Sequence, residues 1–151
     1  MTIDRKRQVF SVHEVEQFVF LIADDEGGVM TCPRLDHFGM SAQISSENRR
    51  QQAISRTVEL ARYPNVHVKV SSAPTYSHEA YPFADMATFI RQVVEAYGRK
   101  RCFWGTDLTH SFDTCTYRQR ITQFTETLDF LSEEDKDWVM GRALMARLGW
   151  S

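Results

Sequence analysis

Hydrophobic residues recur at helical spacing in four segments of the chain, which we predict to be helices. Ser45 or Ser46 can cap the first of them, and Gly98 follows the second where a left-handed C-cap residue belongs. Ser132 can cap the last helix, with Asp135 as its capping-box partner. The four predicted helices cover residues 46–63, 84–97, 117–131 and 132–148.

Short apolar runs lie between these segments and predict strands. Residues 66–70 alternate strictly, with three valines on one face and His67 and Lys69 on the other, which also carries Ser71. Two further strands are predicted at residues 101–104 and at the end of the segment Cys32–His37. Strand starts recur about every 30 to 35 residues, the length of a βα unit that feeds a parallel strand. The pattern therefore predicts an α/β fold with a parallel sheet, and a long loop over residues 71–82.

The first 30 residues do not follow this pattern. Phe18–Ile22 is a continuous apolar run that fits a buried strand or a helical turn, and Asp24–Gly28 fits a turn or loop. We therefore divide the chain into an unplaced N-terminal segment, residues 1–30, and an α/β region, residues 31–151.

Composition narrows the class of protein. The chain has 151 residues and a formal net charge of −2, so nothing in its charge favours nucleic acid or an anionic membrane as a partner. No apolar run approaches the roughly 20 residues of a membrane helix, and the N-terminus lacks the pattern of a signal peptide. Three cysteines without short spacing argue against a disulfide framework or a zinc ribbon. We expect a cytoplasmic protein that acts on a small molecule.

Polar residues follow the predicted strands at three places, where parallel α/β proteins carry reactive groups. His37 can ligate a metal or hold a water, or it can bond the backbone of its loop. Asp107 can take a proton from water or bind a metal, or it can cap the next helix. Lys69 and Ser71 can face a substrate carboxylate, or the polar face of an edge strand can meet solvent.

Other polar side chains are weaker candidates. Cys102 lies inside a predicted strand, where a free cysteine is usually a small core residue. Cys115 has no basic neighbour in the sequence that would lower its thiol pKa. His78 and His110 lie in predicted loops, where histidines are more often surface residues than ligands.

Taken in order, the strand-end motifs resemble a known family. The motifs are Leu35–Gly39, Tyr63–Ser71 and Trp104–Asp107, followed by Met140–Leu144 and Leu148–Trp150. Their order and spacing resemble the C-terminal part of the amidohydrolase-related family, TIM-barrel hydrolases that include lactonases and metal-dependent decarboxylases.

The resemblance implies a partial (β/α)8 TIM barrel that holds strands six to eight with their helices. It implies that His37 and Asp107 are the catalytic residues and the metal ligands. Lys69, Ser71 and Thr106 would then bind substrate. The expected cofactor is a divalent metal such as zinc, or none, and the expected substrates are cyclic esters or amides of small organic acids, such as lactones.

The chain also departs from the family. The first-strand His-x-His pair, which supplies two metal ligands in the family, does not occur, and strands one to four have no counterpart. We expect a truncated gene product, a chain that assembles with another fragment or copy, or an inactive relic. The alternative to a hydrolase is a non-catalytic barrel fragment that forms a homo-oligomer or pairs with another chain. A doubly wound, phosphate-binding domain is a third hypothesis, but the sequence lacks a P-loop or G-x-G-x-x-G turn.

Overall fold

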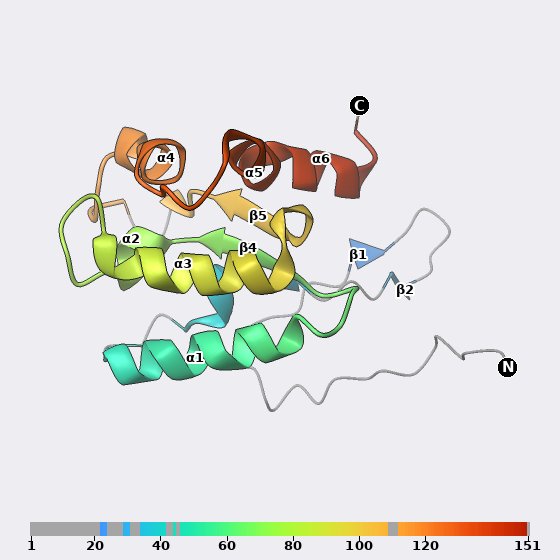
Figure 1. The fold of residues 1–151 in the computed structure, drawn as a ribbon, viewed down its shortest axis with the longest axis horizontal. Helices are drawn as coiled ribbons and strands as arrows, with labels where there is room; N and C mark the ends of the chain where they lie inside the picture. Colours follow the sequence, from blue (N-terminus) through green and yellow to red (C-terminus); the bar gives the residue numbers. More distant parts are fainter. Residues whose placement is uncertain are drawn as a thin grey trace, which may run out of the picture.

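Three parallel strands form the centre of the computed structural model, which describes residues 34–41, 44, 46–108 and 112–150, and the backbone of residues 22–23 and 29–30. The strands are β3 (Arg34–Leu35), β4 (His67–Ser71) and β5 (Cys102–Gly105), with β4 in the middle. This arrangement confirms the α/β class and the parallel sheet (Figure 1).

The register of the sheet sets where each strand ends. Leu35 lies opposite Val68, and Ser71 lies opposite Gly105. Because all three strands run in one direction, the residues that follow them lie at one edge of the sheet. That edge carries the segments that begin at Asp36, Ser72 and Thr106.

Helices cover the sheet on two flanks (Figure 1). On one flank, α1 packs against α3, and on the other η4, a π-helical turn, packs against β5. The valines of the predicted alternation, Val66, Val68 and Val70, are at most 1% exposed, so this face of the strand is buried. The helices are α1 (Glu47–Leu60), α2 (Ala73–Tyr76), α3 (Ala84–Tyr97), α4 (Tyr117–Glu126), α5 (Glu133–Asp137), η4 (Trp138–Arg142) and α6 (Ala143–Leu148).

Several boundaries differ from the prediction. The first helix ends at Leu60, three residues before the predicted end at Tyr63. The third predicted helix, α4, ends at Glu126, and the apolar residues that extended its periodicity, Leu128 and Leu131, are buried in the turn that follows. The final helix contains the π-helical turn η4 between α5 and α6. Hydrophobic spacing cannot distinguish these endings because buried turns present apolar residues too.

The predicted loop over residues 71–82 contains the short helix α2. Pro74 lies in its first turn, where the missing amide proton is not needed, and Tyr76 is buried at its end. Four residues are too few to establish a helical period, so the sequence pattern could not reveal this helix.

The predicted caps are confirmed at two helices. The Ser46 side chain accepts a bond from the Arg49 amide, and Ser132 and Asp135 form a capping box. Gly98 has φ 72° as a C-cap glycine often does, but its ψ of 153° lies outside the left-handed helical region. The chain turns there directly into η2 (Arg99–Arg101) and then β5.

The N-terminal segment contributes an antiparallel pair, β1 (Ile22–Ala23) and β2 (Val29–Met30). The intervening predicted turn and most of the apolar run that begins at Phe18 lie outside the described residues. The strand expected to end at His37 is β3, and His37 itself begins the 3-10 turn η1 (His37–Gly39). Among the described residues, no helix has the length and apolar character needed to cross a membrane.

Candidate active site

Each strand of the parallel sheet is followed by a non-glycine residue with a left-handed backbone. These residues are His37 after β3, Ser72 after β4 and Asp107 after β5, with φ of 49°, 63° and 47°, and Phe38 beside His37 has φ 58°. Such conformations cost on the order of 1–3 kcal/mol each and persist only where surrounding structure enforces them. Their clustering at one rim marks it as the candidate active site.

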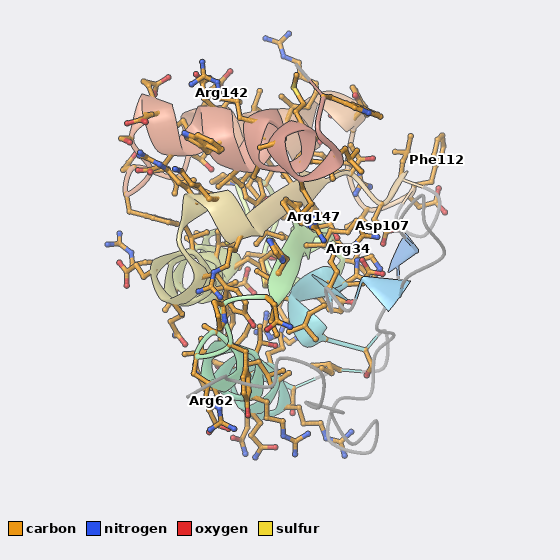
Figure 2. All side chains as sticks on the ribbon, turned by 90° about the vertical axis from the view of Figure 1, so that its right-hand side faces the viewer. Arg34, Arg62, Asp107, Phe112, Arg142 and Arg147 are labelled. Atoms are coloured by element: carbon orange, nitrogen blue, oxygen red, sulfur yellow. The ribbon has the colours of Figure 1, made fainter. Side chains whose placement is uncertain are left out.

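The His37 ring lies between two serine hydroxyls and a carboxylate. Its Nδ1 lies 2.8 Å from Oγ of Ser71 and 3.0 Å from Oγ of Ser72. Its Nε2 lies 3.5 Å from Oδ2 of Asp107. The predicted convergence of His37 and Asp107 at one rim is therefore observed. Figure 2 shows Asp107 on the side of the molecule that also carries the exposed Phe112.

Ser72 links the two predicted catalytic residues and was missed by the sequence analysis. Its hydroxyl donates a 2.5 Å hydrogen bond to Oδ2 of Asp107 while it contacts His37. Strand alternation would point Ser72 away from the face that carries Ser71. The left-handed backbone at Ser72 breaks that alternation, so both hydroxyls reach the same imidazole nitrogen. One signal of Ser72 was available in the sequence: the adjacent pair of serines after a strand.

Lys69 lies on the predicted polar face of β4. Its ammonium lies 3.7 Å from Oδ1 of Asp36, the residue before His37. The side chain passes over Gly105 of β5, where a Cβ atom would lie 3.0 Å from Cε of Lys69. A glycine at this position of β5 therefore leaves room for the lysine stem.

Thr106, predicted to bind substrate, lines a small pocket behind the rim. Its carbonyl oxygen accepts a 3.3 Å hydrogen bond from Arg120 of α4. Arg120 and Gln123 are buried on the same helix and line the same pocket, with Ser71 and Ser72 from the end of β4. Neither residue could be recognised from the sequence, because a polar residue on a helix is usually exposed.

Tyr76 is a buried tyrosine whose pKa is affected by the charge of Asp107. Burial raises the pKa of its phenol to about 12, and the negative charge of Asp107 contributes to the same rise. The hydroxyl donates to the carbonyl oxygen of Met40 at 3.0 Å. Tyr76 is therefore a neutral structural donor beside the site.

The weaker candidates lie apart from this constellation or outside the described residues. Cys102 is fully buried, and burial raises the pKa of its thiol to about 12; burial also raises the pKa of the Cys115 thiol. Neither cysteine is therefore a low-pKa nucleophile, which agrees with the sequence-based expectation that both are weak candidates. His78 lies 3.4 Å from a guanidinium nitrogen of Arg50. His110 and Cys32 lie outside the described residues.

The site offers two ligands for a metal. In a tetrahedral zinc site, nitrogen and oxygen ligands lie about 3.4 Å apart. The separation of 3.5 Å between Nε2 of His37 and Oδ2 of Asp107 fits two such positions. Within the described residues, however, no group of three His, Cys, Asp or Glu side chains could hold a metal. These residues therefore form an incomplete ligand set.

Comparisons with a family profile and with solved structures point to the same family. A profile of the amidohydrolase family matches residues 10–143, a range that starts inside the N-terminal segment which the motifs leave unplaced. A search of curated proteins found no match.

Solved structures with the same fold share little sequence with this chain. One is an amidohydrolase from Burkholderia multivorans with bound zinc (TM-score 0.66, 18% identity), of which 44% is covered by 78% of this chain. Another, from Pseudomonas putida, is provisionally assigned as a 2-pyrone-4,6-dicarboxylic acid hydrolase (TM-score 0.59, 22% identity), with 77% of this chain covering 42% of it. The chain thus spans less than half the length of the structures it resembles.

Proposed function

Because the chain belongs to the amidohydrolase family, we propose that it carries the strand-six to strand-eight part of a TIM-barrel hydrolase that acts on cyclic esters or amides of small organic acids. The observation that supports this most strongly is the meeting of His37, Ser72 and Asp107 at the ends of adjacent parallel strands. The small-molecule substrate, the cytoplasmic location and the absence of nucleic-acid or membrane partners belong to the same proposal.

Asp107 is the proposed general base. It takes a proton from water as the water oxygen attacks the ester carbonyl carbon, and a tetrahedral intermediate forms. When the ring C–O bond breaks, Asp107 returns that proton to the departing alkoxide. The balance is one lactone and one water giving one hydroxy acid. His37 positions the water through its Nε2, which faces the same carboxylate oxygen.

Lys69 is the proposed substrate anchor. Its ammonium is partly exposed at the rim and its partner Asp36 lies at 3.7 Å, beyond a direct hydrogen bond. A substrate carboxylate can therefore compete for the ammonium. The Ser71 and Thr106 side chains complete the proposed substrate-binding group. The dicarboxylate in the name of the Pseudomonas protein fits such an anchor.

A divalent metal such as zinc would be held by His37 and Asp107 and, when bound, would polarise the substrate carbonyl and favour ionisation of water. One neighbour contains zinc. The described residues supply two of its ligands, and the proposed proton transfer is carried by Asp107 itself. Homo-oligomerisation remains a prediction of the sequence analysis.

The test is a hydrolysis assay on the purified chain, with and without added Zn²⁺, against simple lactones and 2-pyrone-4,6-dicarboxylate. Asp107→Asn should lower any hydrolysis by about 100-fold or more, since it removes the base. Asp113→Asn is the control because Asp113 is exposed in the segment that follows the same strand. Hydrolysis unaffected by Asp107→Asn would rule out the proposed mechanism.

A further inference from the structure

The hydroxyl of Ser72 contacts both the imidazole and the carboxylate of the candidate site. It lies 2.5 Å from Oδ2 of Asp107 and 3.0 Å from Nδ1 of His37. An ionised carboxylate only accepts hydrogen bonds, and a serine has one proton to donate. Ser72 therefore commits its proton to Asp107.

With that proton committed, the Ser72 oxygen can only accept a bond from the imidazole. An unprotonated Nδ1 would place two lone pairs against each other at 3.0 Å. A protonated Nδ1 removes this conflict. The same proton can also be shared with Oγ of Ser71, which lies 2.8 Å from Nδ1. The Nδ1–H group then donates to both serine oxygens in a three-centre hydrogen bond.

We propose that Ser72 is a positioning residue that fixes the neutral imidazole of His37 in the Nδ1–H tautomer. The tautomer presents the lone pair of Nε2 toward Oδ2 of Asp107, 3.5 Å away. These two acceptor atoms repel each other unless a water donates to both or a cation binds both, so the tautomer favours such an occupant at the rim. Ser72 thereby sets the atom of His37 that serves the rim, much as outer hydrogen bonds orient ligating histidines in general.

The backbone supports this assignment. Ser72 adopts φ 63° and ψ 18°, a conformation disfavoured for a residue with a side chain. Without it, Ser71 and Ser72 would point to opposite faces of the strand. The strained conformation is what brings the second hydroxyl to His37 and Asp107.

The role of this tautomer in hydrolysis rests on the proposed function, but the tautomer itself can be measured without any enzymatic activity. Metal-free protein labelled with ¹⁵N is studied by NMR under alkaline conditions that keep the imidazole neutral, and His37→Gln assigns its signals. The wild-type spectrum should show the Nδ1–H form of His37 as the dominant species. An Nε2–H form in the wild type would overturn the proposal.

Substitutions distinguish the effect of Ser72 on the His37 tautomer from that of Ser71. Ser72→Ala should end the dominance of the Nδ1–H form, whereas Ser71→Ala should retain it because the bond to Ser72 persists. Ser72→Gly gives the same readout without backbone strain, so it covers a failure of Ser72→Ala to fold. An unchanged tautomer in a folded Ser72 variant would sink the proposal. A wild-type Nδ1–H signal in a chain without hydrolase activity would refute the proposed function and leave this inference standing.

Discussion

Nη1 of Arg50 on α1 donates a 2.7 Å hydrogen bond to Oδ2 of Asp85 in the first turn of α3. The same nitrogen donates to the carbonyl oxygen of Tyr76 at 2.7 Å. Ser77 and the His78 amide also donate to the Asp85 carboxylate. This network joins α1 and α3 to residues 76–78, in the segment that follows Ser72.

Asp85→Asn should destabilise the fold by about 3 kcal/mol near neutral pH, because it leaves the buried Arg50 charge without its partner. Burial alone would raise the pKa of Asp85, but the bonds from Arg50, Ser77 and the His78 amide together hold it below its ordinary value. A lowered folded-state pKa gives stability above the unfolded pKa of about 3.9 that is lost as the pH falls through the folded value.

Urea unfolding at several pH values measures this effect. The difference in free energy of unfolding between wild type and Asp85→Asn should shrink below about pH 4. Asp129→Asn, at an exposed position, should show no such difference. A gap that stays constant to about pH 3 would contradict the assignment.

Gly39→Ala should be strongly destabilising. Gly39 has φ 71°, and a Cβ atom there would lie 2.3 Å from Oγ1 of Thr57, which donates to the carbonyl oxygen of Phe38. Strain and overpacking together should cost about 3 kcal/mol. Because Gly39 ends the turn that begins at His37, the substitution should also disturb the imidazole.

The control for Gly39 is another glycine. A Cβ atom on Gly141, in the π-helical turn, would meet nothing within 4 Å. Gly141→Ala should therefore be neutral or stabilising by up to about 1 kcal/mol. Thermal or urea unfolding measures both, and equal effects at the two positions would refute the steric argument.

The sequence predicted the parts of the fold that rest on periodicity. The alternating valines of β4 identified its buried face, and the regular spacing of strands identified the parallel sheet. From that topology alone, His37 and Asp107 were expected at one rim, and they lie 3.5 Å apart there. Their catalytic roles stay predictions, because a short distance between two side chains does not establish that they catalyse a reaction.

Other features of the fold and the site leave no trace in the hydrophobic pattern of the sequence. Backbone conformation at Ser72 depends on tertiary contacts, so strand alternation could not show that its side chain meets His37 and Asp107. The four-residue helix α2 and the π-helical turn η4 are too short for a period. The burial of Arg120 and Gln123 arises from how α4 packs beside the ends of the strands. Such features are decided by packing rather than by local sequence.

Lys69→Met should raise KM for carboxylate-bearing lactones by at least about tenfold if Lys69 anchors the substrate, which corresponds to the roughly 1.4 kcal/mol of one charge-assisted bond. An uncharged lactone is the control substrate and should show little change. Gly105→Ala should act in the same direction more weakly, because its Cβ would displace the Lys69 stem. Equal losses on both substrates would exclude an anchoring role.

His67→Phe should flatten the pH dependence of stability. Burial lowers the pKa of His67, and positive charge from Arg147, Arg101 and Arg34 lowers it further, against a bond to the Asn65 carbonyl that raises it. With a lowered folded pKa, the unfolded chain binds the extra proton, so stability is full above about 6.5 and falls as the pH drops below it.

Phenylalanine is a suitable replacement for His67 because the His67 ring stacks on Phe103 with centroids 5.2 Å apart. Chemical denaturation between about pH 5 and pH 7 should show a smaller slope of unfolding free energy with pH in the variant. An unchanged slope would mean that His67 has the same proton affinity in the folded and unfolded chain.

Gln123→Met should stabilise the protein by about 1 kcal/mol. Gln123 is 1% exposed, and in the described structure neither atom of its amide has a hydrogen-bond partner. Methionine has a similar length and shape without the desolvated polar atoms. Gln119→Met on the same helix is the matched control, since the Gln119 amide oxygen accepts from the Thr116 backbone in a capping box and its loss should cost about 1 kcal/mol. Urea unfolding measures both variants, and a destabilised Gln123→Met protein would show that the buried amide has a polar role at the pocket behind the rim.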